Sequence, residues 1–243
     1  MSQAMQALYD RIYHDEAKDW TPRKPKPEAI TTNRYDDTIR LLRGEPKRSS
    51  LLEIGCGAGQ MAIPLLNYYD RVTGIDISER RIEIGAAKIA ERFPELAHRI
   101  DLRHGNIDVP LTFADQTFDV VVACAVIEHV FDPFHALDEI ARVLKPGGAV
   151  MITVPNICYI KHAVGLWLGR LPRTGISTND IRVWRTQGWD GGHLHYFSKH
   201  QLTELLHETG FTPEFWTSDG RWAKLRRRCT NLMGNLTVRA RKR

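Results

Sequence analysis

The stretch LLEIGCGAGQ, residues 51–60, decides the fold of this chain. Its first residues are mostly apolar, as in a buried β-strand, and glycines then follow at every second position, 55, 57 and 59. Glycine permits a tight turn with positive φ and lets a ligand approach the backbone closely. The stretch therefore predicts a strand, a glycine loop and the start of a helix whose N–H groups can face a bound ligand.

An acidic residue, Asp76, ends the next predicted strand, RVTGID at 71–76. It follows Gly55 by 21 residues, and a carboxylate in this place can accept hydrogen bonds from both hydroxyls of a ribose. The dinucleotide fingerprint GxGxxG would need its third glycine one residue after Gly59, and here an acidic residue, Glu53, precedes the loop. The pattern favours an unphosphorylated ribose diol and argues against a nicotinamide dehydrogenase.

Helices are expected after the glycine loop and at three further caps. The first helix is expected to run through about Tyr69, with a proline inside it that predicts a short segment or a kink. Ser78 can cap the second helix, and Asp132, before a proline, can cap the third, which is expected to end in the turn at 145–148. Ser198 and a glutamine three residues on form a capping box for the fourth. The face that the second helix is expected to bury consists of Ile82, Ala86, Ile89, Ala90 and Phe93.

Short apolar segments between these helices predict the remaining strands. Three lie at 100–106, 119–126 and 149–155, and two shorter ones lie near 212–217 and 236–239. Strands that alternate with helices imply βαβ units. The sequence therefore predicts an α/β fold with a Rossmann-like, doubly wound, seven-stranded and mostly parallel sheet that carries helices on both faces.

Three regions are expected along the chain. Residues 1–48 should form an N-terminal helical or cap segment, in which the stretch TPRKPKP at 21–27 separates two helices. Residues 49–243 should form one domain, and the long connection at 156–192 predicts a substrate-lid insertion within it. Its large side chains can close over an apolar or aromatic substrate, cover the sheet, or belong to an interfacial helix. They are Tyr159, Leu166, Trp167, Leu168, Trp184 and Trp189.

Composition excludes several classes of protein. With 42% hydrophobic and 26% charged residues, the 243-residue chain is neither disordered nor collagen-like. No apolar run approaches the roughly 20 residues that a membrane-spanning helix needs. The N-terminal residues are polar and acidic, so a cytoplasmic protein is expected. The cysteines, which show no CxxC spacing, are expected to be reduced thiols; they are Cys56, Cys124, Cys158 and Cys229.

The net charge of +5 is unevenly distributed. Nine of the 34 basic residues follow Asp219, where no acidic residue lies, which leaves 25 basic against 29 acidic residues elsewhere. Such a basic end can attract nucleic acid, anionic lipid or a phosphorylated substrate, or it can be a solvated, solubilising end.

From Leu51 to Phe211 the chain resembles the class I S-adenosylmethionine-dependent methyltransferases. It looks closest to the branch of the ubiquinone-biosynthesis-type enzymes, the methyltransferase type 11 and 23-like proteins. Several motifs carry the resemblance in order: LLEIGCGAGQ, GIDIS, HGNIDVPLTFADQTFDVVVACAVIEHV, LDEIARVLKPGG and GHLHYFS. A lone glycine loop would be a weak signal, whereas this ordered set is specific.

The resemblance implies S-adenosylmethionine as cofactor and a set of residues that hold it. The glycine loop would line the methionine end, Asp76 the ribose and Ile77 the adenine, and Cys124 would contribute its backbone. Asn106 stands where the family often has an acidic residue near the adenine amino group, and an amide oxygen can accept the same hydrogen bond. The complete expected set is Glu53, Gly55, Cys56, Gly57, Gly59, Asp76, Ile77, Asn106, Ile107 and Cys124.

Three histidines are candidates for catalysis, because a hydroxyl that attacks the methyl group benefits from a general base. His129 lies in the turn after the fourth strand, and His193 and His195 lie in GGHLHYF, where the family has its substrate cavity. The pair His193 and His195 could chelate a metal, but no third ligand has convincing spacing, so no metal is expected. Cys56 and Cys124 are expected to pack rather than to react.

The predicted function is transfer of a methyl group to an oxygen or nitrogen of a small molecule. One alternative is an RNA methyltransferase that uses the basic C-terminal segment, but the sequence shows no RNA-binding module, so a nucleic-acid partner is not expected. Another alternative is a non-catalytic cofactor-binding protein. Peripheral contact with a membrane and the oligomeric state stay open, and no transmembrane segment is expected.

Overall fold

The computed structural model describes residues 6–7, 10, 20–24, 31–43, 45, 48–176, 178, 180–221 and 223–243. About half of the expected N-terminal segment, including most of its first helix and the end of the stretch at 21–27, lies outside the described residues.

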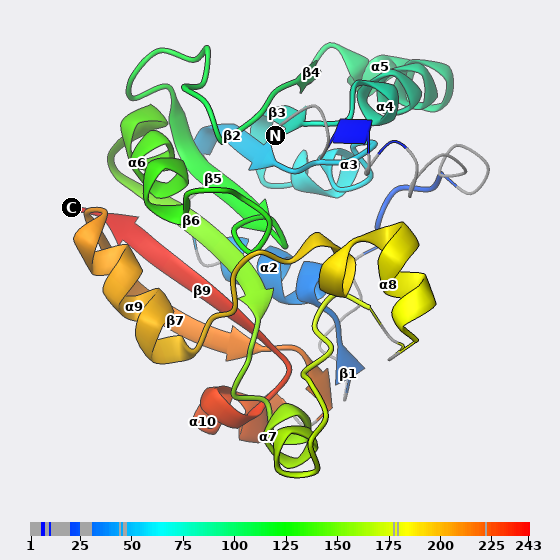
Figure 1. The fold of residues 1–243 in the computed structure, drawn as a ribbon. Coiled ribbons are helices and arrows are strands. Elements are labelled where there is room, and N and C mark those ends of the chain that lie inside the picture. Colours follow the sequence, from blue (N-terminus) through cyan, green and yellow to red (C-terminus); the bar gives the residue numbers. More distant parts are fainter. Residues whose placement is uncertain are drawn as a thin grey trace.

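A seven-stranded sheet forms the centre of the molecule, in the order β4-β3-β2-β5-β6-β9-β7 (Figure 1). Only β9 runs against its neighbours, because β6 and β7 both pair with it antiparallel while the other pairs are parallel. The predicted α/β fold with a doubly wound, mostly parallel sheet is therefore confirmed. The strands are β2 (Arg48–Ile54), β3 (Tyr69–Asp76), β4 (Ile100–His104), β5 (Phe118–Cys124), β6 (Leu144–Pro155), β7 (Phe211–Ser218) and β9 (Asn235–Lys242). A separate two-stranded sheet pairs β1 (Thr31–Thr32) with β8 (Gly220–Arg221).

Helices cover both faces of the sheet, as predicted. Helices α2 and α3 pack on the face to which β2 sends Leu51, and helices α6 and α9 pack on the face to which it sends Leu52. Both leucines are fully buried, which is what a parallel sheet covered on two sides requires. The helices are α2 (Arg34–Leu42), α3 (Ala62–Leu65), α4 (Glu79–Arg92), α5 (Pro94–Ala97), α6 (Pro133–Val143), α7 (Ile160–Trp167), α8 (Ile181–Gln187), α9 (Lys199–Glu208) and α10 (Ala223–Arg228), with short 3₁₀ turns η1 (Trp189–Gly192) and η2 (Thr230–Leu232). None of the helices within the described ranges has the length and hydropathy to cross a bilayer.

The predicted helix caps are all present. The Ser78 side chain accepts a hydrogen bond from the Arg81 N–H at the start of α4. The Asp132 side chain accepts hydrogen bonds from the Phe134 and His135 N–H groups at the start of α6. Ser198 caps α9, and Gly210 beyond its end has φ of 84°, the left-handed conformation that glycine adopts without strain.

Three local predictions are wrong in detail. The helix after the glycine loop has four residues and does not reach Tyr69, where β3 begins, although the short segment expected from its proline is confirmed. The turn expected at 145–148 is part of β6, which begins at Leu144 with an irregular register against β5. On α4, Ala86 and Ala90 are exposed and Gly85 is buried instead, since a Cβ at that glycine would lie 2.5 Å from a carbonyl oxygen of the glycine loop.

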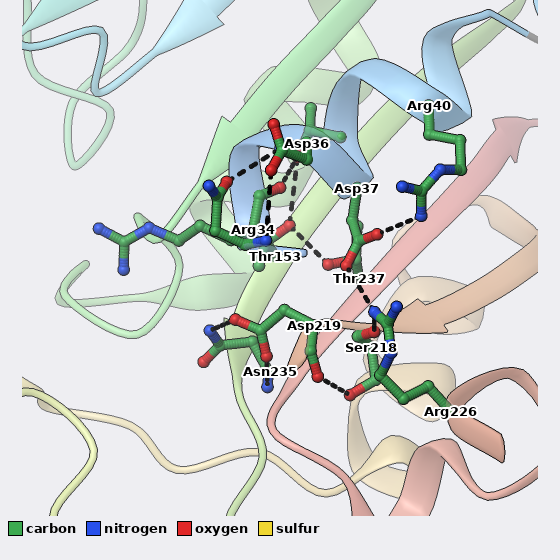
Figure 2. A network of polar contacts seen from close by, with 12 residues as sticks. Arg34, Asp36, Asp37, Arg40, Thr153, Ser218, Asp219, Arg226, Asn235 and Thr237 are labelled. Atoms are coloured by element: carbon green, nitrogen blue, oxygen red, sulfur yellow. Dashed lines mark hydrogen bonds and ion pairs between the residues drawn. The ribbon is translucent and has the colours of Figure 1, made fainter. Parts of the chain in front are cut away.

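Several basic residues of the C-terminal segment are built into the fold, so among the described residues this segment is not simply a solvated end. Arg226 of α10 is buried, with Nη1 3.5 Å from Oδ2 of Asp37 in α2, and it also donates to the Ser218 carbonyl (Figure 2). Arg241 of β9 binds the Glu45 carboxylate through two hydrogen bonds of 2.8 Å each.

Strand β9 has two chemically different faces because its side chains alternate. Val238 and Ala240 belong to the apolar core beside α6 and α9. Arg239 points to the opposite face, where its Nε lies 3.1 Å from Glu214 of β7. On that face Thr237 and Thr153 share a hydrogen bond of 3.0 Å beneath α2 (Figure 2). A polar layer therefore joins α2 to the C-terminal part of the sheet.

Replacing Arg226 with methionine should destabilise the protein by about 3 kcal/mol, because it leaves the buried Asp37 carboxylate with one guanidinium partner fewer. The matched control is Arg228→Met in the same helix, where the side chain is exposed and should cost less than about 0.5 kcal/mol. Urea unfolding followed by circular dichroism measures both. Equal stability of the two variants would show that the buried pair contributes nothing.

Candidate functional site

A cavity of about 240 Å³ opens at the carboxyl ends of the central strands. It lies where the strand order reverses between β2 and β5, which is the usual ligand site of doubly wound sheets. A second cavity of about 160 Å³ adjoins it, since Arg34, Gly55 and Arg81 line both. Eight of the ten predicted cofactor residues line one or both cavities: Glu53, Gly55, Cys56, Asp76, Ile77, Asn106, Ile107 and Cys124.

The three glycines of the loop have positive φ but different surroundings. Gly55, with φ of 69°, lines both cavities, and its N–H donates to the Ile75 carbonyl. Gly57, with φ of 58°, lies beneath the guanidinium of Arg81. Gly59 faces Leu102, where a Cβ would come within 2.7 Å of that side chain. The loop therefore exposes backbone at Gly55, whereas Gly57 is buried under Arg81 and Gly59 packs closely against Leu102.

Asp76 lies at the end of β3 and is 5% exposed. Its Oδ2 accepts a 2.7 Å hydrogen bond from the Gly57 N–H, and its Oδ1 accepts one of 3.0 Å from Ser78. The guanidinium of Arg81 is 3.6 Å from Oδ2. These contacts fix the carboxylate at the cavity wall, where its remaining lone pairs can accept hydroxyl groups.

Glu53 is buried behind the glycine loop, and its Oε2 has no hydrogen-bond partner among the residues that the structure describes. Burial, with a smaller effect from the neighbouring Asp76, raises the pKa of Glu53 to about 8. A buried carboxyl group without a partner is suited to receive a cationic ligand group, which would restore its charge.

The far end of the cavity holds the residues expected around the adenine. Ile77, Asn106 and Ile107 line it. The amide oxygen of Asn106 already accepts a 2.9 Å hydrogen bond from the Asp108 N–H. Asp108 itself also lines the cavity, and its carboxylate accepts from the Phe131 N–H at 2.7 Å. The sequence analysis did not single out Asp108, although it lies two residues from a predicted site residue.

The two cysteines near the site have the surroundings of packing residues. Burial raises the pKa of the Cys124 thiol to about 12 and that of Cys56 well above its usual value. Neither thiol is therefore activated as a nucleophile.

Two of the three candidate histidines, His129 and His193, line the cavity. Their ring centroids lie 4.6 Å apart in an edge-to-face arrangement. Burial and the neighbouring His193 lower the pKa of His129 to about 4, and burial also lowers the pKa of His193. His195 does not line the cavity, and its Nε2 lies 3.0 Å from the Val130 carbonyl.

The hydrogen bonds of these two rings determine which nitrogen carries the proton. Nδ1 of His129 lies 3.1 Å from the Gly192 carbonyl, which can only accept, so this Nδ1 donates. The Thr174 hydroxyl donates to Oδ2 of Asp190 at 2.5 Å and lies 2.6 Å from Nδ1 of His193. Because that hydroxyl proton is already used, Nδ1 of His193 must donate to it. Both imidazoles therefore carry their lone pair on Nε2.

Asp190 holds the segment that brings His193 to this place. The carboxylate is fully buried and accepts hydrogen bonds from the backbone N–H groups of Thr174, Gly175 and Ile176. Its own φ of 43° is left-handed, a conformation that costs free energy in a residue other than glycine. The sequence analysis missed Asp190, because only its tertiary contacts distinguish it from an ordinary loop carboxylate.

Glu128 is a further residue that the sequence analysis missed, although it lies within the quoted turn IEHV. It is 1% exposed, and neither carboxylate oxygen has a hydrogen-bond partner in the described part of the chain. Burial raises its pKa to about 8. Its backbone carbonyl accepts from the N–H groups of Leu194 and His195, which ties the histidine segment to the turn.

The large side chains expected to cover a substrate do not line the cavity. Trp184 is buried against Trp189, and Trp167 is 93% exposed at the end of α7. The insertion instead contributes small residues, Thr174, Gly175 and Gly191, to the cavity wall. The aromatic side chains of the insertion therefore do not line the cavity in this structure, contrary to the expectation that they close over a substrate.

Comparison with known proteins identifies the family. The sequence profile of a methyltransferase domain matches residues 27–214, which is most of the chain. The chain belongs to the S-adenosylmethionine-dependent methyltransferase family. It is 37% identical over 190 residues to the demethylmenaquinone methyltransferase of Halalkalibacterium halodurans, with 72% of each chain covered. It is 36% identical over 117 residues to the human mitochondrial ubiquinone biosynthesis O-methyltransferase, covering 48% of this chain and 31% of that protein.

Coverage differs among these relatives, since the chain spans only about a third to two fifths of several curated methyltransferases that it matches. Among solved structures, an S-adenosylmethionine-dependent methyltransferase from Mesorhizobium loti has a TM-score of 0.63 at 17% identity, covering 88% of this chain and all of that one. The [4+2]-cyclase SpnF has a TM-score of 0.67 at 21% identity, covering 100% and 97%. These likenesses show the shared fold.

S-adenosylmethionine is the cofactor of the family, and the residues at the site fit it. The exposed backbone at Gly55 leaves room for the methionine part, and Glu53 offers its buried Oε2 for the ammonium. Asp76 offers a carboxylate for a ribose diol.

The raised pKa of Glu53 predicts a pH-dependent stability. The folded group titrates near pH 8 and the unfolded group near 4.5, so the unfolded state binds fewer protons between these values. Stability conferred by this group should therefore be lost as pH rises from 5 to 8, by up to about 4 kcal/mol. Replacing Glu53 with glutamine should flatten the profile, which urea unfolding at several pH values measures.

Glu83→Gln is the matched control, because that glutamate is exposed on α4 and should leave the profile unchanged. A Glu53→Gln variant with the same pH dependence as the unmodified protein would contradict the assignment of the raised pKa to Glu53.

Proposed function

We propose that this chain transfers the methyl group of S-adenosylmethionine to a hydroxyl oxygen of a small phenol- or quinol-like molecule. The observation that carries the proposal is one cavity lined both by Gly55 and Asp76 and by His129 and His193, two imidazoles whose Nδ1 contacts leave the lone pair on Nε2. The names of relatives in ubiquinone and menaquinone biosynthesis support the class of acceptor.

On the cofactor side, the proposed contacts follow the fit described above. Glu53 would bind the ammonium, Asp76 the ribose hydroxyls, and Ile77 and Ile107 the faces of the adenine. When bound, the cofactor supplies a methyl group already activated by its sulfonium. The task of the protein is therefore to align the acceptor, and alignment can contribute up to about 7–11 kcal/mol.

On the acceptor side, His129 and His193 can each accept a hydrogen bond from the acceptor hydroxyl through Nε2. The insertion at 156–192 is proposed to determine which acceptor fits, because it supplies Thr174 and Gly175 to the wall beside His193. Placing His195 in a catalytic role has less support, since its ring is bound to a backbone carbonyl outside the cavity.

The alternatives have less support. The arginines of β9 and Arg226 are engaged in ion pairs within the fold, so they do not form the open basic surface that RNA binding needs. The fold alone does not decide between methyl transfer and other reactions, because one structural neighbour is named a [4+2]-cyclase. The cytoplasmic location stays a prediction.

Formation of S-adenosylhomocysteine with a panel of phenols and quinols tests the activity. Asp76→Ala should weaken binding of S-adenosylhomocysteine at least about tenfold in calorimetry, since hydrogen bonds to a charged group contribute about 1.5–3 kcal/mol. The control is Asp101→Ala on the adjacent β4, a partly exposed carboxylate paired with Arg103, which should bind normally. Unchanged affinity in Asp76→Ala, with the fold intact by circular dichroism, would refute the ribose assignment.

We also propose that the surface around α7 rests on an anionic lipid surface. No residue of α7 is buried, and its exposed apolar side chains include Val164, Trp167 and, just beyond it, Leu168. Lys161 and Arg170 are exposed beside them, and the sequence has no acidic residue at 157–179. An apolar surface with basic flanks is suited to an anionic membrane, where lipophilic acceptors would also lie.

Replacing Trp167 and Leu168 together with serine should lower partitioning into phosphatidylglycerol vesicles at least about tenfold, because two apolar side chains are lost from the interface. Vesicle sedimentation measures this. Leu232→Ser is the control, since Leu232 is also an exposed apolar residue but belongs to η2 and not to α7. Equal partitioning of the double variant and the unmodified protein would exclude α7 as the contact.

A further inference from the structure

We propose that Glu128, His129 and His193 form a binding site for one divalent transition-metal ion, and that Zn²⁺ is the ion their donor atoms fit best. One donor atom from each residue lies within 4.8 Å of the other two. This set differs from the pair His193 and His195 that the sequence suggested as a chelate. The ring of His195 is bound to the Val130 carbonyl instead, and Glu128 and His129 join His193 in the cluster.

The carboxylate of Glu128 is the first reason. The side chain is 1% exposed, and both oxygens lack a hydrogen-bond partner in the part of the chain that the structure describes. A buried carboxylate in this state is costly unless it is neutralised by a proton or a cation. One ring nitrogen from each of His129 and His193 lies within 4.8 Å of a Glu128 carboxylate oxygen, and the Arg34 guanidinium is a cationic group of the chain that acts on this carboxylate.

The two imidazoles are the second reason. His129 donates from Nδ1 to the Gly192 carbonyl, and His193 donates from Nδ1 to the Thr174 hydroxyl, which is itself held by Asp190. Metal-binding histidines are typically oriented in this way, with the nitrogen that does not bind the ion donating to a carbonyl or to a chain that ends in a carboxylate. Nε2 of each ring is then the nitrogen that would bind.

The donor set indicates the class of ion. Two imidazole nitrogens and one carboxylate oxygen suit Zn²⁺ and its neighbours, whereas Mg²⁺ and Ca²⁺ prefer oxygen ligands throughout. Donors at about 2.0–2.2 Å from a tetrahedral ion lie about 3.4 Å apart, so the three groups must close by a modest movement. Glu128 can make it most easily, since no hydrogen bond holds its carboxylate.

Three protein ligands leave a coordination position open, as in catalytic rather than structural zinc sites. His129 and His193 line the cavity and Glu128 lies behind them, so the open position would face the cavity. On the proposed function, an acceptor hydroxyl would bind there and lose its proton to water more readily. Its oxygen lone pair then forms the C–O bond while the C–S bond breaks and the sulfur keeps the electron pair.

Metal binding is tested on the full chain after treatment with a chelator. Titration with Co²⁺, followed by its visible absorption, and competition by Zn²⁺ should show one site per chain. Glu128→Gln should lower the affinity at least about tenfold. Thr174→Val, which removes the hydroxyl that links His193 to Asp190, should lower it about 10–100-fold. The control His195→Ala removes a nearby histidine outside the cluster and should bind as the unmodified protein does.

Absence of saturable Co²⁺ and Zn²⁺ binding, or equal affinity in Glu128→Gln, would overturn the site. Equal loss in His195→Ala would also overturn it, because the ion would then bind elsewhere. The outcome is independent of the proposed methyl transfer. Full turnover by the chelated protein would support that function while removing the role of the ion, and binding without turnover would support the site while refuting the function.

Discussion

The ion pair between Asp37 and Arg226 connects the two ends of the chain, and the position of the ligand cavity depends on it. It belongs to the polar layer that fixes α2 on β5, β6 and β9 (Figure 2). The first residue of that helix, Arg34, lines both cavities. A helix that slid on the sheet would move this guanidinium, so the layer sets the position of α2 relative to the glycine loop. Directional charge contacts can fix such a register better than apolar packing, although they add little net stability.

The second constraint is the close approach of backbone to backbone around the glycine loop. Gly85 of α4 lies against the Ala58 carbonyl, and Gly59 lies against Leu102, so neither position has room for a side chain. This packing holds the loop in its left-handed conformation before any ligand arrives. The Asp76 carboxylate accepts hydrogen bonds from two backbone N–H groups, those of Gly57 and Ser78. These bonds already orient it to accept a pair of hydroxyl groups.

The fold could be predicted from the sequence because its signals are local. The glycine loop, the caps at Ser78 and Asp132 and the alternation of strands with helices each involve neighbouring residues. The site could be predicted only in part, because His129 and His193 meet through contacts of residues far apart in the chain. The count of charged residues suggested a solvated C-terminal segment for the same reason. It could not show that Arg226 is buried against Asp37, because that partner lies nearly two hundred positions earlier in the sequence.

Two buried acids would favour cationic ligands at the proposed site, Glu53 beside the second cavity and Glu128 next to the histidines. Glu53 and Glu128 are both so enclosed that their pKa values rise to about 8, which keeps them protonated at neutral pH without a partner. A cation beside either group would lower that pKa and expel the proton, so part of the binding free energy is used to ionise the acid. The resulting preference is for ligands that bring full positive charge. An ammonium meets that condition at Glu53, and a divalent ion shared with two imidazoles meets it at Glu128.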